Sequence, residues 1–316
     1  MRAVGYNNPP VALSPPDSFF SLARPALTQF RSSTAMLSYR HAFHAGNHAD
    51  VLKHAVVVHL LRHLCQKDKA FWYIDTHAGA GVYSLVDGYA TKTGESETGI
   101  ERLWGLRDLP SFLKDYVNEI RALNSDGTLN FYPGSPYLAW RLMREQDRAR
   151  LFELHSTEID VLRHNFRDAG RRAILYEGDG FDGIIKLLPP PPRRALVLID
   201  PSYEDKRDYA RTLNCLEESL KRFATGTYAV WYPQVTRLES QRFPDQLKRV
   251  QPKNWLHVSL TVSKPPVDGF GLFGSGMFVV NPPYTLVAAL KEALPYLVDK
   301  LGQDGKAAFK LEHRGD

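Results

Sequence analysis

The sequence predicts an α/β protein built on a largely parallel sheet of seven strands. From about residue 47 onward, short apolar runs alternate with amphipathic helical patterns, an arrangement typical of parallel sheets. Several apolar runs end directly in an acidic residue or a glycine turn, which is where open α/β sheets bind their ligands. With 316 residues, 43% of them hydrophobic, the chain can bury a full core, so we expect one large domain with an insertion.

The first helix is expected to run from Asn47 to about Cys65. Asn47 and Asp50 are spaced as a capping pair, with the acid in the first turn, where the helix dipole favours it. Apolar residues then recur at helical spacing along the rest of the segment, which indicates a helix with a buried face.

A small helical subdomain is expected between the first strand, at 71–75, and the second, at 149–154. Residues from about 90 to 132 hold two helical patterns, 100–106 and 111–123, but no strand pattern. A glycine-rich connection before the last strand predicts a hairpin and one antiparallel strand. The other expected elements are helices near 136–144, 158–168, 181–187, 209–222 and 240–250, and strands at 173–177, 195–199, 227–232, 257–262 and 277–281.

The first 35 residues differ from the rest of the chain. They are rich in proline and serine, lack apolar periodicity and contain a single acid, so we expect a disordered extension at 1–35 and an ordered domain at 36–316. Met36 stands where order is expected to begin, and the simplest hypothesis is that translation starts there. A transit peptide is the alternative, because arginines and serines occur here without an apolar segment for secretion.

Charge and composition limit the classes of function. A formal net charge of +5 and a pI near 9.0 permit a polyanionic partner without requiring one. Cys65 and Cys215 make no disulfide framework, so a cytoplasmic location is expected. No apolar stretch approaches the roughly 20 residues that cross a bilayer, which argues against a membrane protein.

The first strand runs into a glycine-bearing turn, Asp75-Thr76-His77-Ala78-Gly79-Ala80-Gly81. Its glycines let the backbone approach a bound cofactor closely, so Gly79 is a candidate cofactor-binding residue. The dinucleotide fingerprint needs a third glycine where this chain has Ser84, which weakens a nicotinamide interpretation. The turn fits better with the loop that holds the methionine part of S-adenosylmethionine.

Two acids follow the next strands in the order that a doubly wound sheet requires. Glu153 ends the second strand, where its carboxylate could accept both ribose hydroxyls of the cofactor. Asp179 follows the third strand, where it could accept from the adenine amino group. Each acid taken alone is more often a helix N-cap or a solvated charge. Their shared position at the carboxyl ends of strands indicates one cofactor site.

The fourth strand ends in Asp200-Pro201-Ser202-Tyr203. The exocyclic amine of adenine has its lone pair drawn into the ring, so it attacks a methyl donor only when hydrogen-bond acceptors repyramidalise the nitrogen. Asp200 and the carbonyl of Pro201 are candidate acceptors, and the proline ring keeps them aimed. Tyr203 could stack on a base taken out of its helix. We therefore expect Asp200, Pro201 and Tyr203 to be catalytic residues of an amino-group methyltransferase.

A second motif, Asn281-Pro282-Pro283-Tyr284, matches the amino-methyltransferase pattern more closely. Its position argues against a catalytic role, because it ends the seventh strand whereas the catalytic motif is expected after the fourth. Prolines at this point also suit a plain junction between a strand and a helix. We therefore favour Asp200 over Asn281.

Longer stretches of the sequence resemble the RlmJ family of bacterial 23S ribosomal RNA adenine-N6 methyltransferases, which modify adenine-2030. The resemblance covers nearly everything from Met36 onward. It implies a class I, Rossmann-like, S-adenosylmethionine-dependent methyltransferase domain with a small helical subdomain, acting as a monomer on protein-free 23S rRNA. The stretches that carry the resemblance are Met36 to His54, the turn 75–81, and residues 132–136, 153–155, 179–180 and 224–233.

The resemblance also implies roles for single residues. Asp200 would be the catalytic acceptor and Tyr39 would touch the RNA. One position departs from the family, which usually shows Asp-Pro-Pro-Tyr: Ser202 replaces the second proline, restores a backbone N–H and loosens the loop, although we still expect a working enzyme. The cofactor contacts implied are His54, His77, Ser135, Glu153, Asp179, Gly180 and Asp200.

The segment before and within the first helix points to RNA rather than to a metal. Six histidines lie between residues 41 and 63, but no cysteine or acid cluster completes a zinc site, so no metal is expected. Arg40 beside Tyr39 and Phe43 is the better candidate for an RNA contact, because a cation among aromatic rings can stack on unpaired bases. An ordinary segment at the domain edge is the alternative.

Two other functions stay open from the sequence alone. The four-residue motif also serves enzymes that methylate guanine N2 or DNA adenine. The second alternative is a non-catalytic RNA-binding protein that keeps a methyltransferase fold. The departure from the catalytic motif at Ser202 is the reason to consider it.

Overall fold

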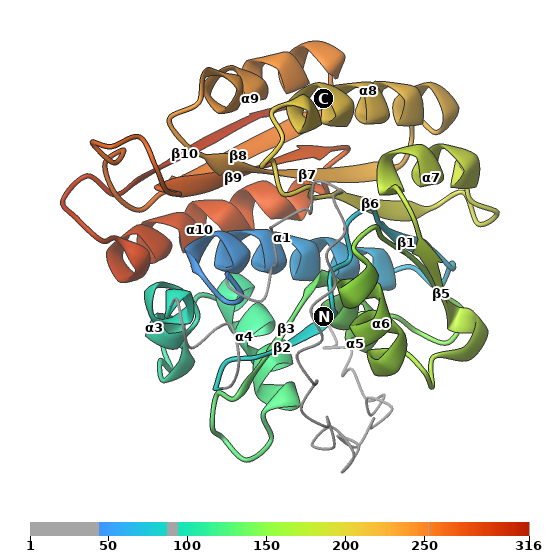
Figure 1. Ribbon diagram of the computed structural model, residues 1–316, viewed down its shortest axis with the longest axis horizontal. Helices are drawn as coiled ribbons and strands as arrows, with labels where there is room; N and C mark the ends of the chain where they lie inside the picture. The colour runs from blue at the N-terminus through green and yellow to red at the C-terminus, as the bar shows by residue number, and fades with distance from the viewer. Residues whose placement is uncertain (1–43, 87–93, 252, 316) are drawn as a thin grey trace, which may run out of the picture. The chain divides into compact units, whose positions relative to one another are not determined.

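A mixed β-sheet lies at the centre of the computed structural model, which describes residues 44–86, 94–251 and 253–315 (Figure 1). Within these residues the sheet has eight strands in the order β10-β8-β9-β7-β6-β1-β4-β5. Its strands are β1 (Trp72–Asp75), β4 (Arg148–Glu153), β5 (Ala173–Glu177), β6 (Ala195–Ile199), β7 (Thr227–Gln234), β8 (Trp255–Thr261), β9 (Gly274–Val280) and β10 (Ala308–Arg314). The expected extension at 1–35 and its proposed end at Met36 lie outside the described residues.

The strand order places the two central strands at a topological switch point. From β1 the chain moves outward through β4 to β5, and then returns to β6 on the other side of β1. β1 pairs in parallel with both β4 and β6. In sheets of this kind, ligands bind in the crevice at the carboxyl ends of the strands that flank such a switch.

The expected α/β fold is confirmed, but the predicted strand number was short by one. β9 runs antiparallel to both β7 and β8, as the glycine-rich connection predicted. The additional strand, β10, pairs antiparallel with β8 at the edge of the sheet. Most of its side chains are exposed, so apolar alternation does not mark it in the sequence.

Helices cover both faces of the sheet, with α7, α8 and α9 on one face and α1, α5, α6 and α10 on the other (Figure 1). Each expected helix is present, with ends shifted by a few residues, and α10 is a further helix that the sequence analysis did not predict. The bounds of the helices are α1 (His48–Cys65), α5 (Ser135–Leu142), α6 (Ser156–Asn165), α7 (Gly180–Leu187), α8 (Arg207–Arg222), α9 (Leu238–Val250) and α10 (Tyr284–Leu301), and a 3₁₀ turn, η3, spans Gly170–Arg172.

Helix α1 is buried along nearly its whole length. It begins as the sequence predicted, because the side chain of Asn47 accepts hydrogen bonds from the backbone N–H groups of Ala49 and Asp50. The sheet lies on one side of α1 and helix α4 of the insertion on the other, so the charged residues Asp50 and Lys53 are buried together with the apolar ones. Buried charges of this kind require partners.

The insertion between β1 and β4 contains more than the helices that the sequence predicted. Two strands of three residues pair antiparallel, and they are too short to give a recognisable pattern. Residues 94–130 carry seven acids and four basic residues, so this subdomain is net acidic. Its described elements are β2 (Val82–Ser84), η2 (Glu95–Thr98), α3 (Glu101–Trp104), α4 (Ser111–Leu123) and β3 (Phe131–Pro133).

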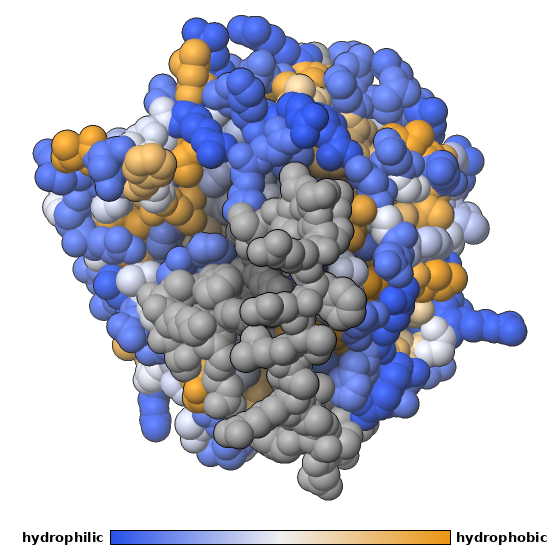
Figure 2. Space-filling model, in the orientation of Figure 1, coloured by the Kyte–Doolittle hydropathy of each residue, from blue (hydrophilic) through white to orange (hydrophobic). Residues whose placement is uncertain are grey.

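The surface on the side shown in Figure 2 is mostly hydrophilic, with apolar residues in scattered groups. In the described part of the chain, no helix combines the length and the hydrophobicity that crossing a membrane requires.

Candidate active site

Four acidic side chains meet along the carboxyl edge of the sheet. Asp75 and Glu153 are the last residues of β1 and β4, while Asp179 and Asp200 follow β5 and β6. Because these strands are neighbours and run in parallel, their carboxyl ends lie side by side. The strand-end positions that the sequence singled out therefore belong to one site.

The turn after β1 is built around glycine and the carboxylate of Glu153. Gly79 and Gly81 have φ of +61° and +84°, a region in which residues with a Cβ are strained. The N–H of Gly79 donates to Glu153 Oε2 at 2.8 Å, and the N–H of His155 donates to Oε1 at 2.7 Å. Burial raises the pKa of Glu153, and the two backbone donors oppose that rise. Each oxygen keeps a lone pair for a ligand hydroxyl.

Gly180 lets helix α7 approach the same turn. A Cβ at this position would lie 1.9 Å from the carbonyl oxygen of Thr76, so only glycine fits without a backbone shift. Asp179 precedes it as the N-cap of α7, and its Oδ1 accepts from the N–H of Phe181 at 2.9 Å. The other oxygen of Asp179 pairs with Arg211. Asp179 and Gly180 therefore lie against the glycine turn, as a cofactor site requires.

His77 packs beside this helix start. Its ring meets the ring of Phe181 edge-on, with centroids 4.8 Å apart. The guanidinium of Arg211 lies over the ring of Phe181, 4.4 Å from its centroid. Burial lowers the pKa of His77 to about 4, so the imidazole is neutral at physiological pH. A neutral ring suits a contact with an uncharged part of a cofactor.

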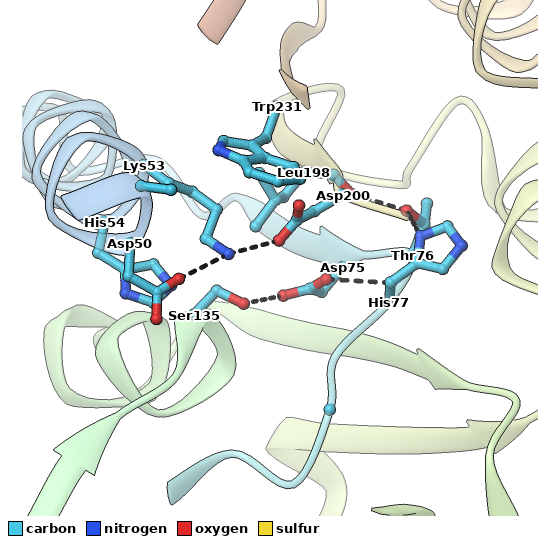
Figure 3. A network of polar contacts seen from close by, with 12 residues as sticks. Asp50, Lys53, His54, Asp75, Thr76, His77, Ser135, Leu198, Asp200 and Trp231 are labelled. Atoms are coloured by element: carbon cyan, nitrogen blue, oxygen red, sulfur yellow. Dashed lines mark hydrogen bonds and ion pairs between the residues drawn. The ribbon is translucent and has the colours of Figure 1, made fainter. Parts of the chain in front are cut away.

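Asp75, the last residue of β1, holds the residues around the site together through buried hydrogen bonds. Its carboxylate is fully buried and accepts hydrogen bonds from Ser135 Oγ at 2.6 Å and from the hydroxyl of Tyr73 at 2.7 Å. The backbone N–H of His77 donates to the other oxygen at 3.2 Å. Ser135, which the family resemblance assigned to the cofactor, thus ties the start of α5 to the end of β1 (Figure 3).

His54 lies on α1 and is buried in a chain of hydroxyl groups. Its Nδ1 is 2.7 Å from the hydroxyl of Tyr132, which in turn lies 2.9 Å from the hydroxyl of Tyr116. Both tyrosines come from the insertion or its border. His54 therefore links α1 to the insertion, and its expected contact with the cofactor stays a prediction.

Asp200 is held by a buried lysine that the sequence analysis did not single out. Lys53 Nζ lies 2.7 Å from Asp200 Oδ2 and 2.9 Å from Asp50 Oδ1 (Figure 3). Only 5% of the Lys53 side chain and 12% of the Asp200 side chain are exposed. The ammonium also lies over the indole of Trp231, a residue within β7, at 5.3 Å from the ring centroid. One signal could have revealed Lys53: it is the only lysine of the predicted helix and lies three residues after Asp50, the spacing of an ion pair on one helix face.

Tyr203 is not presented to a base in this structure, contrary to the stacking role that the motif suggested. Its side chain is 3% exposed, and its hydroxyl donates to the carbonyl of Trp231 at 2.7 Å. Its ring packs against those of Tyr209 and Phe243. The residue has a φ of +55°, so the loop turns the ring inward, towards the core. Pro201 is also buried, and Ser202 is half-buried.

Asn281 lies at the opposite edge of the sheet from Asp200. It follows β9, which runs antiparallel to β7, so its strand ends where the parallel strands begin. Its side-chain amide donates to the carbonyls of Ala224 and Gly226 at 2.8 and 2.7 Å. The motif at 281–284 is therefore a structural junction, in agreement with the argument from strand order.

The remaining sequence-based candidates give less information. Tyr39 and Arg40 lie outside the described residues. His44 pairs with Glu95 at 2.8 Å, and His59 bonds Thr285 at 3.0 Å. Among the described residues, no three histidines, cysteines or acids are grouped in a way that could hold a metal ion.

The fold and the site together define a class I, Rossmann-like methyltransferase. The chain matches the family model RsmJ, described as "Ribosomal RNA large subunit methyltransferase D, RlmJ", over residues 68–313. It therefore belongs to this family of methyltransferases, and the resemblance drawn from the sequence motifs is confirmed. Membership also implies that the enzyme uses a methyl donor.

Relatives and a solved structure agree with this assignment. A protein of Haemophilus influenzae named "Ribosomal RNA large subunit methyltransferase J" is 47% identical over 278 residues, which are 88% of this chain and 98% of the relative. An Escherichia coli protein of the same name is 47% identical over 266 residues, 84% of this chain and 94% of the relative. The crystal structure of a Legionella pneumophila protein is 36% identical, with a TM-score of 0.79, and covers 86% of this chain and 98% of that one.

Replacing Gly180 with alanine is expected to damage the cofactor side of the site. The new Cβ would overlap the carbonyl of Thr76, so α7 or the glycine turn must move, at a cost of about 1–3 kcal/mol in the free energy of unfolding. Calorimetric titration with S-adenosylmethionine should show weaker binding. Gly105→Ala is the control, because nothing lies within 4 Å of its Cβ position. Equal binding by Gly180→Ala and wild type would contradict this account of the turn.

The variant Tyr203→Phe tests the role of the hydroxyl in holding the loop. It leaves the buried carbonyl of Trp231 without its donor, which is expected to lower the free energy of unfolding by about 1–3 kcal/mol. Urea unfolding measures this value. Tyr284→Phe, at a side chain 85% exposed, should be nearly neutral, and an equally neutral Tyr203→Phe would show that the hydroxyl does not stabilise the loop.

Proposed function

We propose that this protein transfers a methyl group from S-adenosylmethionine to the exocyclic N6 amine of an adenine in 23S rRNA. The observation that carries the proposal is the buried carboxylate of Asp200 at the end of β6, next to the glycine turn and fixed by Lys53. The named activity of the relatives from two bacteria supports ribosomal RNA as the substrate. The expected target, adenine-2030, rests on the family resemblance alone.

The residues around the glycine turn fit S-adenosylmethionine. Gly79 and Gly180 carry no side chain, so the backbone of the turn and of the start of α7 can approach a ligand closely. Glu153 offers two carboxylate oxygens that already accept from the backbone. Glu153 would hold the ribose hydroxyls, and Asp179 the adenine amine. When bound, the cofactor supplies an electrophilic methyl group.

Asp200 and the carbonyl of Pro201 would hold the target amine. A carboxylate has about four lone-pair positions, so Oδ2 can keep its bond to Lys53 while the amine also donates to Asp200. Acceptance of both amine protons restores the nitrogen lone pair and directs it towards the donor side of the site. Holding the two reactants in line can contribute roughly 7–11 kcal/mol.

Lys53 would keep Asp200 ionised and in one orientation. An ammonium 2.7 Å from the carboxylate favours its charged form. Strong basicity is not needed, because the methylated amine is acidic and loses its proton readily. Asp200 therefore acts by orientation and by electrostatic stabilisation of the charge that develops on nitrogen.

The remaining assignments concern the substrate and its setting. We propose that Tyr203 supports the catalytic loop from the core, with stacking on the base as a second role that requires the loop to open. Tyr39 and Arg40 are proposed RNA contacts on the strength of the sequence. We also propose that the enzyme acts in the cytoplasm as a monomer on protein-free rRNA.

The direct test is methylation of a 23S rRNA transcript with tritiated S-adenosylmethionine, followed by digestion to nucleosides. Label in N6-methyladenosine is expected. Label in N2-methylguanosine, or label in DNA but not in RNA, would assign a different substrate. Failure to bind the cofactor by calorimetry would favour a non-catalytic RNA-binding protein.

Asp200→Ala is expected to lower methyl transfer by more than about 100-fold, because the amine loses a preorganised acceptor. Cofactor affinity should fall only moderately, since the glycine turn and Glu153 are intact. Asp205→Ala is the matched control, because Asp205 lies in the same loop and pairs with the exposed Arg207. Full turnover by Asp200→Ala in the tritium assay would refute the catalytic assignment.

Lys53→Met tests whether the ion pair sets the state of Asp200. Removing one partner of a buried ion pair typically costs about 3–5 kcal/mol, so the double variant Lys53→Met with Asp50→Asn is included to limit unfolding. The acidic limb of its pH–rate profile should move to higher pH, because loss of a cation disfavours the carboxylate form of Asp200. Lys53→Arg should retain the wild-type limb. An unshifted profile in the double variant would exclude this role for Lys53.

A further inference from the structure

The loop that joins β8 to β9 exposes apolar side chains without packing them. Val267 is 99% exposed and Phe270 is 81% exposed. Apolar residues break the hydrophilic surface at this end of the molecule, at the left of Figure 2. Neither side chain contributes to the core, so the fold does not explain why they are apolar.

The loop lies at the same edge of the sheet as the candidate active site. β8 and β7 are both antiparallel to β9, so β8 runs parallel to β7 and β6, and it ends at the edge where Asp200 lies. Neighbouring strands are about 4.8 Å apart, so β9 and β8 lie roughly 10–14 Å from β6. That is too far to reach the amine held by Asp200, so the loop would meet the RNA beside the target adenine rather than the adenine itself.

Hydrogen bonds connect the loop to the segment that supports the catalytic loop. The N–H of Phe273 donates to the carbonyl of Gln234 at 3.1 Å, and Thr236 Oγ1 donates to the carbonyl of Gly269 at 2.7 Å. The next residue, Arg237, donates to the carbonyls of Tyr203 and Glu204, each at 3.0 Å. The exposed loop is therefore fixed relative to Asp200.

The tip of the loop is shaped to present one ring. Gly269 and Gly271 flank Phe270 with φ of +78° and +107°, conformations that side chains other than glycine rarely adopt. The N–H of Phe270 donates to Asp268 Oδ1 at 3.1 Å, and the N–H of Gly269 donates to the carbonyl of Pro266 at 3.1 Å. The backbone is thus held while the ring stays open to solvent.

The proposed reaction requires a surface that covers the bases beside the target adenine, and an aromatic ring on the β8–β9 loop could provide it. Taking an adenine out of its stack also exposes the faces of the bases beside it, and proteins cover unpaired bases with aromatic rings. Tyr203 offers no open face in this structure, because it is 3% exposed. The ring of Phe270 is exposed to solvent and lies at the same edge of the sheet as Asp200.

We propose that Phe270 stacks on an unpaired base that flanks the target adenine and so fixes the substrate RNA at the site. This inference rests on the proposed function and deepens it. The loop carries one lysine, Lys264, and one acid, Asp268, between residues 263 and 273, so it adds no net charge. The contact should therefore act through stacking rather than through phosphate binding.

The test compares Phe270→Ala, Phe270→Trp and wild type on a short 23S rRNA hairpin that contains the target adenine. Phe270→Ala should raise the Kd and the KM for RNA about tenfold, within the range of one base–aromatic stack, and leave kcat and the affinity for S-adenosylmethionine unchanged. Phe270→Trp should restore binding. The salt dependence of the Kd should stay the same in all three, because no phosphate contact is lost.

Tyr284→Ala is the matched control, since that ring is similarly exposed but begins α10 at the opposite edge of the sheet. A 2-aminopurine beside the target should be quenched by wild type and by Phe270→Trp, and less so by Phe270→Ala. Thermal unfolding of Phe270→Ala should match wild type, because the ring is not packed.

Several results would overturn the inference. RNA binding by Phe270→Ala within twofold of wild type, while wild type methylates the hairpin normally, removes the stacking role and leaves the proposed function intact. A wild-type dimer in sedimentation that Phe270→Ala abolishes would assign the ring to a second copy of the chain. A wild-type protein that neither binds nor methylates RNA would remove both proposals.

Discussion

The ion pair between Lys53 and Asp200 is the contact on which the arrangement of the site depends. An ammonium that is only 5% exposed cannot remain charged without partners, and it has two carboxylates within 2.9 Å. Asp50 lies on the same helix as Lys53, whereas Asp200 lies in the loop that follows β6. The position of α1 against the sheet therefore sets the position of the carboxylate that the reaction needs.

The paired central strands β1 and β6 connect the glycine turn to the loop that carries Asp200. Asp75 and Leu198 are paired in register on β1 and β6, and both the N–H and the hydroxyl of Thr76 donate to the carbonyl of Leu198 at 3.1 Å. The turn that would hold the methyl donor and the loop that would hold the amine are thus attached to one rigid pair of strands. Rigid attachment of this kind preserves the alignment of two reactants.

Sequence patterns predicted the parts of the fold that are periodic and the site residues that end strands. Glu153, Asp179 and Asp200 could be found because parallel strands deliver their last residues to one edge. Lys53 could not be paired with Asp200, since the two are 147 positions apart and sit on a helix and a loop that meet only in the folded chain. β10 was missed because the side chains of this exposed edge strand do not alternate regularly between apolar and polar residues along its length.

Tyr203 shows a different limit of motif reading. The four-residue pattern specifies residue types, but a φ of +55° turns the ring towards Trp231 and the core. Side-chain direction at such a position depends on backbone conformation, which the motif does not record. The exposed ring at Phe270 belongs to no motif and emerged only from the placement of the β8–β9 loop.

The acids of the insertion bear on how this subdomain is attached to the rest of the domain. Residues 94–130 carry a net negative charge, and helix α4 packs against α1. Two acids of α4, Asp115 and Glu119, each pair with Arg62 of α1 at 3.1 Å. The excess of acids is therefore partly balanced by cations outside the insertion, so charge as well as apolar packing holds the subdomain against α1.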